Sequence, residues 1–192
     1  MSYLRRLSIL FPVLLLALPL SAQQGDLTDT DRAAIRTVIE RQLEALRQDD
    51  AAGAFALASP EIQAKFETPE RFLTMVQTWY QAVLEAQKAA IAAAKSGAAC
   101  EDVDGAARQV LAGYHLDHLF VHSTGHGLGL EVHEDPRVAR GQKKRLEPGN
   151  VITIEPGVYS AGIGGIRIED DVAVHADHTE VLTRAPRDLI EI

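Results

Sequence analysis

A change of pattern near Gly113 constrains the fold more than any other feature of the sequence. Before it, alanine-rich stretches place apolar residues at helical spacing, which predicts helices over 79–95 and 102–112. After it, short β-branched runs alternate with glycine-rich turns, as is typical of strands. The predicted strands are residues 119–122, 151–155 and 166–169. Helices followed by short strands predict an α+β architecture.

Each of the two predicted helices has an apolar side. We expect these sides to pack on the outer face of one curved sheet that contains residues 151–155 and 166–169. Gly97 is expected to end the first helix. The residues expected to point inward are Tyr80, Val83, Ala86, Ala90 and Ala94 in the first helix, and Val103, Ala106, Ala107 and Val110 in the second.

Residues 23–78 are predicted to form a separate helical region without histidine. Thr28 can cap a helix over about 31–48. A second helix over 51–58 stops at Ser59-Pro60, and a third, over about 69–78, begins at Thr68-Pro69. The aspartates of this region are expected in caps or at helix ends. The first helix is expected to pack its apolar face against a core. This face is formed by Ile35, Val38, Ile39, Leu43 and Leu46.

The first 22 residues have the pattern of a signal peptide. Arg5 and Arg6 precede an apolar run over 7–20, and small residues follow up to Ala22. The run is short for a membrane span, which takes roughly 20 residues, although an uncleaved anchor is the alternative. We therefore expect a periplasmic or secreted protein that meets the membrane only through the signal peptide during export.

The net charge argues against one class of partner, and the single cysteine limits how the fold can be held together. The 192-residue chain has a formal net charge of −8, and an acidic surface argues against nucleic acid as a partner. A single cysteine, Cys100, cannot form an intramolecular disulfide. The fold must therefore be held by packing or by metal, and a homo-oligomer is left open.

Three histidines lie close together in one glycine-rich segment: His122, His126 and His133. The glycines around His126 make a regular helix unfavourable there and let the backbone approach a bound ion or ligand closely. Neutral imidazole is a good ligand for divalent transition metals. Solvated loop histidines are the alternative interpretation of this segment alone.

Two glutamates are associated with apolar strands. Glu155 ends the run over 151–155, and Glu169 lies within the run over 166–169. An isolated buried carboxylate is costly unless it is paired or binds a metal, so each requires a cation. Arg167 could supply one, and a divalent ion could supply a larger one. With His126, the two glutamates make a mixed nitrogen and oxygen ligand set.

Three segments in this order and spacing resemble the signature of Xaa-Pro aminopeptidases and prolidases: HSTGHGLGLEVHEDPRV, LEPGNVITIEPGVYSAG and GGIRIEDDVAV. The resemblance covers residues 79–192 and implies the C-terminal half of a pita-bread metallopeptidase domain. Residues 36–76 are similar to a small exported bacterial domain of unknown function. The sequence thus predicts a signal peptide at 1–22, a helical domain at 23–78 and the partial peptidase domain at 79–192.

The resemblance also implies roles for individual residues. His126, Glu155 and Glu169 would be metal ligands, while His122 and His133 would bind substrate, stabilise the tetrahedral intermediate or shuttle protons. Arg167 would be a partner of the ligand carboxylates, and Glu155 would take the proton of the attacking water. The implied reaction is hydrolysis of the peptide bond preceding proline by a metal hydroxide, on peptides with proline in second position, with Mn, Zn or Co.

The chain departs from the family pattern in one respect. The family uses two further aspartate ligands, on a hairpin ahead of the long helix, and no such segment occurs before Trp79. The remaining ligands are expected to hold one ion rather than two, and activity is expected to be impaired. A non-catalytic exported peptide-binding module is the alternative. A purely structural protein would not explain why His126, Glu155 and Glu169 occur together.

Overall fold

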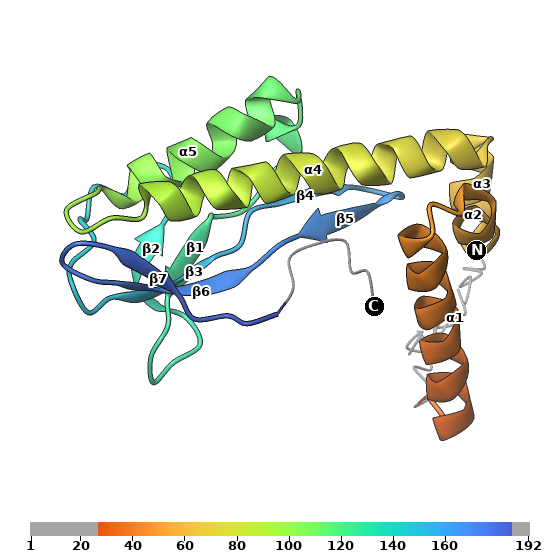
Figure 1. Cartoon of the computed structure of the whole chain (residues 1–192), viewed down its shortest axis with the longest axis horizontal. Coiled ribbons are helices and arrows are strands. Elements are labelled where there is room, and N and C mark those ends of the chain that lie inside the picture. The colour runs from red at the N-terminus through yellow and green to blue at the C-terminus, as the bar shows by residue number, and fades with distance from the viewer. Residues whose placement is uncertain (1–26, 186–192) are drawn as a thin grey trace, which may run out of the picture.

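The computed structural model describes residues 27–185 (Figure 1). Its helices are α1 (Asp29–Arg47), α2 (Ala51–Ala56), α3 (Pro60–Phe66), α4 (Pro69–Ala93), α5 (Cys100–Gly113) and the short 3-10 helix η1 (Asp117–Leu119). Within 27–185, no helix is both long and apolar enough to cross a membrane. The predicted signal peptide lies outside the described residues.

The strands form an antiparallel sheet and a separate hairpin, so the predicted α+β architecture is confirmed. The five-stranded sheet has the order β2-β1-β3-β6-β7, and β4 pairs only with β5. The strands are β1 (Gly125–Gly127), β2 (Glu134–Val138), β3 (Val151–Ile154), β4 (Gly157–Ser160), β5 (Gly164–Arg167), β6 (Asp170–Val174) and β7 (Thr179–Val181).

The core lies between the sheet and the helices α4 and α5, which cover it together (Figure 1). Most residues predicted to point inward do so: Val83, Ala86, Ala90, Ala94, Val103 and Ala107 are fully buried, while Tyr80, Ala106 and Val110 are partly buried. Alanines on α4 allow close approach to α5, and larger side chains such as Leu111 and Ile152 fill the core. Truncating such a side chain to alanine costs about 2–5 kcal/mol.

Helix α4 is one unbroken helix, although two helices meeting near residue 78 were predicted. No glycine or proline interrupts its 25 residues after Pro69, and Thr68 caps its first turn. The expected boundary between the helical region and the peptidase part therefore falls inside a continuous helix. The helix ends at Ala93, before Gly97, which instead has a φ of 84° in the following turn.

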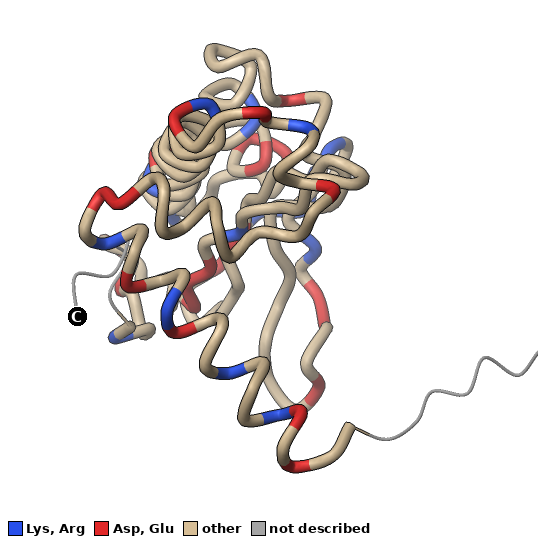
Figure 2. Tube along the Cα trace, turned by 90° about the vertical axis from the view of Figure 1, so that its right-hand side faces the viewer, with Lys and Arg blue, Asp and Glu red and all other residues tan. Residues whose placement is uncertain are grey.

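The N-terminal helices differ from expectation in two ways. Ser59-Pro60 begins a helix, α3, because Ser59 accepts a hydrogen bond from the backbone N–H of Ile62 and Pro60 occupies the first turn. The predicted apolar face of α1 packs only near its C-terminal end, where Ala45 is buried, and Ile35 and Ile39 are about half exposed. Acidic and basic residues alternate along α1 (Figure 2).

The strand predicted at 119–122 is absent, because an arginine takes the place of a sheet partner. Arg108 donates hydrogen bonds from Nη1 to the carbonyl of Phe120 and from Nη2 to that of His122, at 2.9 and 2.6 Å. These carbonyls are thereby satisfied without a neighbouring strand. The segment forms η1 and then a loop leading into β1.

The strand predicted at 166–169 was expected in the same sheet as residues 151–155, but it lies in the separate two-stranded sheet. Residues 164–167 form β5 and pair with β4, because a tight turn after Ser160, with Gly164 at a φ of 133°, folds the chain back on itself. The neighbours of β3 are β1 and β6, and β6 begins at Asp170, directly after Glu169. Residues 151–154 are a strand as predicted.

Candidate functional site

The three sequence segments meet at one end of the sheet. His126 is the central residue of β1, and β1 pairs with β3 at Gly127 and Ile152. Glu155 directly follows β3, and Ile154 at the end of β3 pairs with Asp170, the first residue of β6. Glu155, which follows β3, and Glu169, which precedes β6, therefore lie at the same end of two neighbouring strands.

Glycine is required beside His126 for packing between strands. A Cβ at Gly125 would lie 1.8 Å from the carbonyl oxygen of Thr153, and one at Gly127 would lie 2.3 Å from that of Asp135. Any side chain would push β1 away from its neighbours on both sides. These glycines thus admit adjacent backbone, whereas the sequence suggested that they admit a ligand.

The contact between His126 and Glu155 calls for a proton or a cation. Nε2 of His126 lies 3.2 Å from Oε1 of Glu155, while Nδ1 lies 2.9 Å from the carbonyl oxygen of Gly127. A carbonyl only accepts, so Nδ1 carries a hydrogen and Nε2 of the neutral ring has a lone pair. That lone pair would face a carboxylate oxygen. Either an imidazolium or a shared cation removes this repulsion.

Glu155 is buried, with 8% of its surface exposed, and is held on three sides. Nη1 of Arg167 lies 3.3 Å from its Oε2, and the hydroxyl of Thr153 donates to its Oε1 at 3.1 Å. The same hydroxyl accepts a hydrogen bond from the backbone N–H of His126 at 3.1 Å. Thr153 thus contacts both the backbone of His126 and the side chain of Glu155, and Arg167 is one of the two cations expected beside this carboxylate.

Glu169 is electrostatically coupled to this pair. Partial burial is the main cause that raises the pKa of Glu169, and the negative charge of Glu155 adds to it. Asp171 also raises this pKa, whereas the positive charge of Arg167 and the ring of His126 lower it. The carboxyl group of Glu169 therefore holds a proton more readily than an isolated glutamate does.

His122 is enclosed by aromatic rings. Its ring centroid lies 4.9 Å from that of Phe120 and 5.4 Å from that of Tyr159. Nδ1 lies 2.8 Å from the carbonyl oxygen of Ser123, while Nε2 is buried and has no hydrogen-bond partner. A buried polar atom without a partner is costly, so Nε2 is suited to a ligand's polar group.

Tyr159 connects His122 with the carboxylates, and no sequence pattern predicted this role. Its hydroxyl accepts a hydrogen bond from Nε of Arg167 at 2.8 Å, while Nη1 of the same guanidinium contacts Glu155. His133 lies on the other side, with its ring 4.3 Å from that of His126 and an exposed side chain. The structure therefore links five of the predicted site residues, His122, His126, His133, Glu155 and Arg167, by direct contacts or through Tyr159, whereas Glu169 is linked to them only by charge.

The candidate ligands are of types that suit a divalent metal ion, but their side chains do not converge on one point. One imidazole nitrogen and two carboxylates suit a divalent ion, and the Nε2 to carboxylate contact of His126 would be relieved by one. Within 27–185, however, no three His, Cys, Asp or Glu side chains are placed to hold an ion together. Arg167 occupies one oxygen of Glu155 instead. The donor set fits, but its side chains do not form a coordination site as they lie.

Three aspartates within residues 27–78 have local partners, and none of the three reaches the candidate site. Asp31 completes the capping box of α1, and Asp50 caps α2 by accepting from the backbone N–H of Gly53. Asp49 accepts a hydrogen bond from the side chain of Gln77. Each of these carboxylates thus has a local structural partner.

Comparison with known proteins relates residues 64–176 to metallopeptidases. The sequence profile of metallopeptidase family M24 matches residues 64–176. An Xaa-Pro dipeptidase of Pyrococcus furiosus is 45% identical over 111 residues, which are 58% of this chain and 32% of the relative. The prolidase structure of Pyrococcus horikoshii has a TM-score of 0.59 at 45% identity, covering 61% of this chain and 34% of that one. An X-Pro aminopeptidase structure of Thermotoga maritima has a TM-score of 0.58 at 40% identity, covering 59% and 32%.

These structures define the class of fold as a partial pita-bread α+β domain. The chain belongs to metallopeptidase family M24. It spans about a third of the length of the curated relatives that it matches.

Proposed function

We propose that this chain binds peptides with proline in second position and hydrolyses the bond preceding proline slowly, as a weakened prolidase-type peptidase. The observation that carries the proposal is the buried carboxylate of Glu155, held among His126, Thr153 and Arg167. It supports a hydrolytic site because the resemblance assigns His126 and Glu155 to the metal and Glu155 also to proton transfer. The family match supports the reaction class.

Three residues would hold a divalent ion of the Mn, Zn or Co type: His126, Glu155 and Glu169. Such an ion, when bound, supplies a Lewis acid and an activated water. Glu155 has to exchange Arg167 for the ion, and this exchange favours weak binding of one ion. The chain shows no counterpart of the family's two further aspartates among residues 27–78, which supports impaired activity.

The remaining residues act on the peptide. Glu155 is the proposed proton acceptor, and its contacts with Arg167 and Thr153 hold its carboxylate in position beside His126. Nδ1 of His122 donates to the carbonyl of Ser123, so the unpartnered Nε2 can accept a hydrogen bond from a substrate amide. The exposed ring of His133 beside His126 can exchange protons with solvent. We also propose that the protein acts in the periplasm or outside the cell, after export.

A non-catalytic peptide-binding module is the second candidate. It is favoured by the salt bridge between Arg167 and Glu155, which satisfies the carboxylate without any metal. In that case the polar groups of His122 and Tyr159 would contact a bound peptide, and no bond would be cleaved.

Turnover of a proline-containing dipeptide by the full chain distinguishes the two candidates. We expect slow release of proline with Mn²⁺, Zn²⁺ or Co²⁺, abolished by chelator and by Glu155→Gln, and unchanged in the exposed control Glu147→Gln. Dipeptide binding that survives chelator, without any proline release, would support the binding module. Absence of both binding and release would overturn the proposed function.

A further inference from the structure

A pair of histidines flanks the turn between β6 and β7, outside the site described above. His175 follows β6 and His178 precedes β7, with the two-residue loop 176–177 between them. The backbone N–H of His175 donates to the carbonyl of His178 at 2.8 Å, one residue beyond the pair Val174 and Thr179. Residues directly opposite on antiparallel strands point to the same face. Both imidazoles therefore project from one side of the turn.

Each imidazole is oriented by a carboxylate. The rings stack with centroids 4.4 Å apart and planes 9° apart. Nε2 of His175 lies 3.1 Å from Glu180, and Nδ1 of His178 lies 2.8 Å from Asp177. Ionised carboxylates only accept, so these two nitrogens carry the hydrogens. In the neutral rings, the lone pairs are then on Nδ1 of His175 and Nε2 of His178.

This pattern is the one that metal-binding histidines show. A metal-ligating imidazole usually donates its other N–H to a carboxylate, which fixes the tautomer and raises the basicity of the ligating nitrogen. Here two neighbouring imidazoles have this support, and the charge of Asp177 and Glu180 also offsets that of a cation. The histidine side chains are 42% and 60% exposed, so an ion can reach them from solvent.

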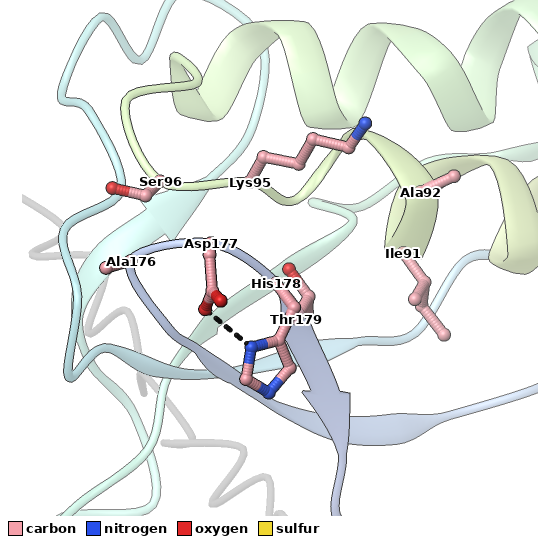
Figure 3. A pocket seen from close by; sticks show the side chains of 8 residues that line it. All are labelled: Ile91, Ala92, Lys95, Ser96, Ala176, Asp177, His178 and Thr179. Atoms are coloured by element: carbon pink, nitrogen blue, oxygen red, sulfur yellow. Dashed lines mark hydrogen bonds and ion pairs between the residues drawn. The ribbon is translucent and has the colours of Figure 1, made fainter.

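The surroundings hold the turn in place. The hydroxyl of Thr179 donates to the carbonyl of Ala94, which ties the turn to the end of α4. Between them lies a cavity of about 520 Å³, with Lys95 and Ser96 on one side and Asp177 and His178 on the other (Figure 3). Anchoring both strands restricts the rotation of the histidines and lowers the entropy lost on binding.

The turn lies at the end of the sheet opposite to Glu155. In the pairing of β3 with β6, Ile154 is opposite Asp170 and Val151 is opposite Ala173. Three residues of strand separate these pairs by about 10 Å, and the histidine pair lies beyond the second. The two places can therefore be tested independently.

We propose that His175 and His178 together bind one divalent transition-metal ion that prefers imidazole ligands, such as Zn²⁺, Ni²⁺ or Cu²⁺. Within residues 27–185 no three metal-binding side chains are placed around one point, so two imidazoles and solvent form the coordination shell. Because the ring planes are only 9° apart, binding requires the two rings to rotate until both lone pairs point at one ion. Two protein ligands give modest affinity, and imidazole donors favour these metals over Mg²⁺ or Ca²⁺.

Calorimetric titration of the full chain with ZnCl₂ tests this proposal. All titrated proteins carry Glu155→Gln and His126→Ala, so that an ion bound at the candidate peptidase site is not counted. We expect one ion per chain, and loss of this binding in His175→Ala with His178→Ala. Asp177→Asn is expected to weaken binding by about 10-fold, because it removes the support of one ring.

The matched control removes two other exposed histidines, as His115→Asn with His118→Ala. Asparagine is chosen because His115 has a φ of 58°, which asparagine tolerates. Amide NMR spectra with Ni²⁺ give a second readout, in which residues 174–180 should broaden first. Unchanged Zn²⁺ binding in the His175 and His178 variant, an equal loss in the control, or broadening centred elsewhere would overturn the proposal.

Discussion

Arg108 contacts the fully buried carboxylate of Asp104, with Nε 2.6 Å from Oδ2, and links helix α5 to the loop that carries His122. The other oxygen of Asp104 accepts hydrogen bonds from the backbone N–H and the hydroxyl of Thr124, at 3.2 and 2.8 Å. Thr124 in turn accepts at its carbonyl from the backbone N–H of Glu155, at 2.7 Å. One buried ion pair thus positions the segment before β1 and the backbone of Glu155.

Replacement of Asp104 by asparagine is expected to lower the free energy of unfolding by about 3 kcal/mol, because it leaves the charge of Arg108 partly buried and unpaired. Urea unfolding measures the change. Asp102→Asn, an exposed acid in the first turn of the same helix, is the control and should change stability by less than about 0.5 kcal/mol. Equal effects of the two substitutions would show that the buried pair does not support the loop.

The sequence predicted the strands and helices that carry regular patterns, and it failed where tertiary partners replace local ones. Val151 to Ile154 were recognised as a strand because they are apolar and β-branched. The loop through Phe120 has similar residues, yet Arg108 supplies its hydrogen bonds from a distant helix. The ion pair of Asp104 and Arg108 was not predicted, since its burial depends on the packing of α5 against the rest of the core.

Arg167 is expected to keep the pKa of Glu169 from rising further. Its positive charge lowers this pKa, so Arg167→Leu should raise it. Carbon-detected NMR titration of the Glu169 carboxyl group, in metal-free protein, measures the change. Arg140→Leu removes an exposed arginine elsewhere as a control and should leave the pKa where it is. A fall of the pKa in Arg167→Leu would contradict the assigned contacts.

Glu169→Gln is expected to stabilise the metal-free protein above the pKa of Glu169. Because this pKa is raised on folding, the folded state binds the proton more tightly, and stability falls as pH rises from the ordinary value of 4.5 through the raised value. Glutamine removes that loss. The variant should melt about 1–2 °C higher near pH 8, with no gain near pH 4. Thermal unfolding at both pH values in chelator provides the test, and a gain confined to acid would refute it.

The candidate site was predictable in its residues but not in its connections. His126 and Glu155 were identified from the histidine spacing and the acid at the strand end, and they are in contact. Thr153 and Tyr159 were missed, because a threonine inside a strand and a tyrosine near a turn carry no local signal of function. Their roles arise from the pairing of β1 with β3 and of β4 with β5, which brings together residues far apart in the chain.

The number of metal ions bound per chain tests the candidate peptidase site. At the His126, Glu155 and Glu169 site we expect at most one weakly bound divalent ion, because two carboxylates balance the charge of one ion but not of two. Glu169→Gln should weaken this binding by about 10-fold, since it removes a ligand oxygen and its charge, whereas His133→Ala should change it less. The raised pKa of Glu169 means that binding should release a proton when metal displaces it.

The measurement combines elemental analysis with calorimetry in buffers of different ionisation enthalpy, which reports the released proton. All proteins carry His175→Ala and His178→Ala, so that an ion at the turn between β6 and β7 is not counted. Two tightly held ions per chain in this background would show that other residues replace the family's aspartates. A larger effect of His133→Ala than of Glu169→Gln would instead move His133 into direct contact with the metal.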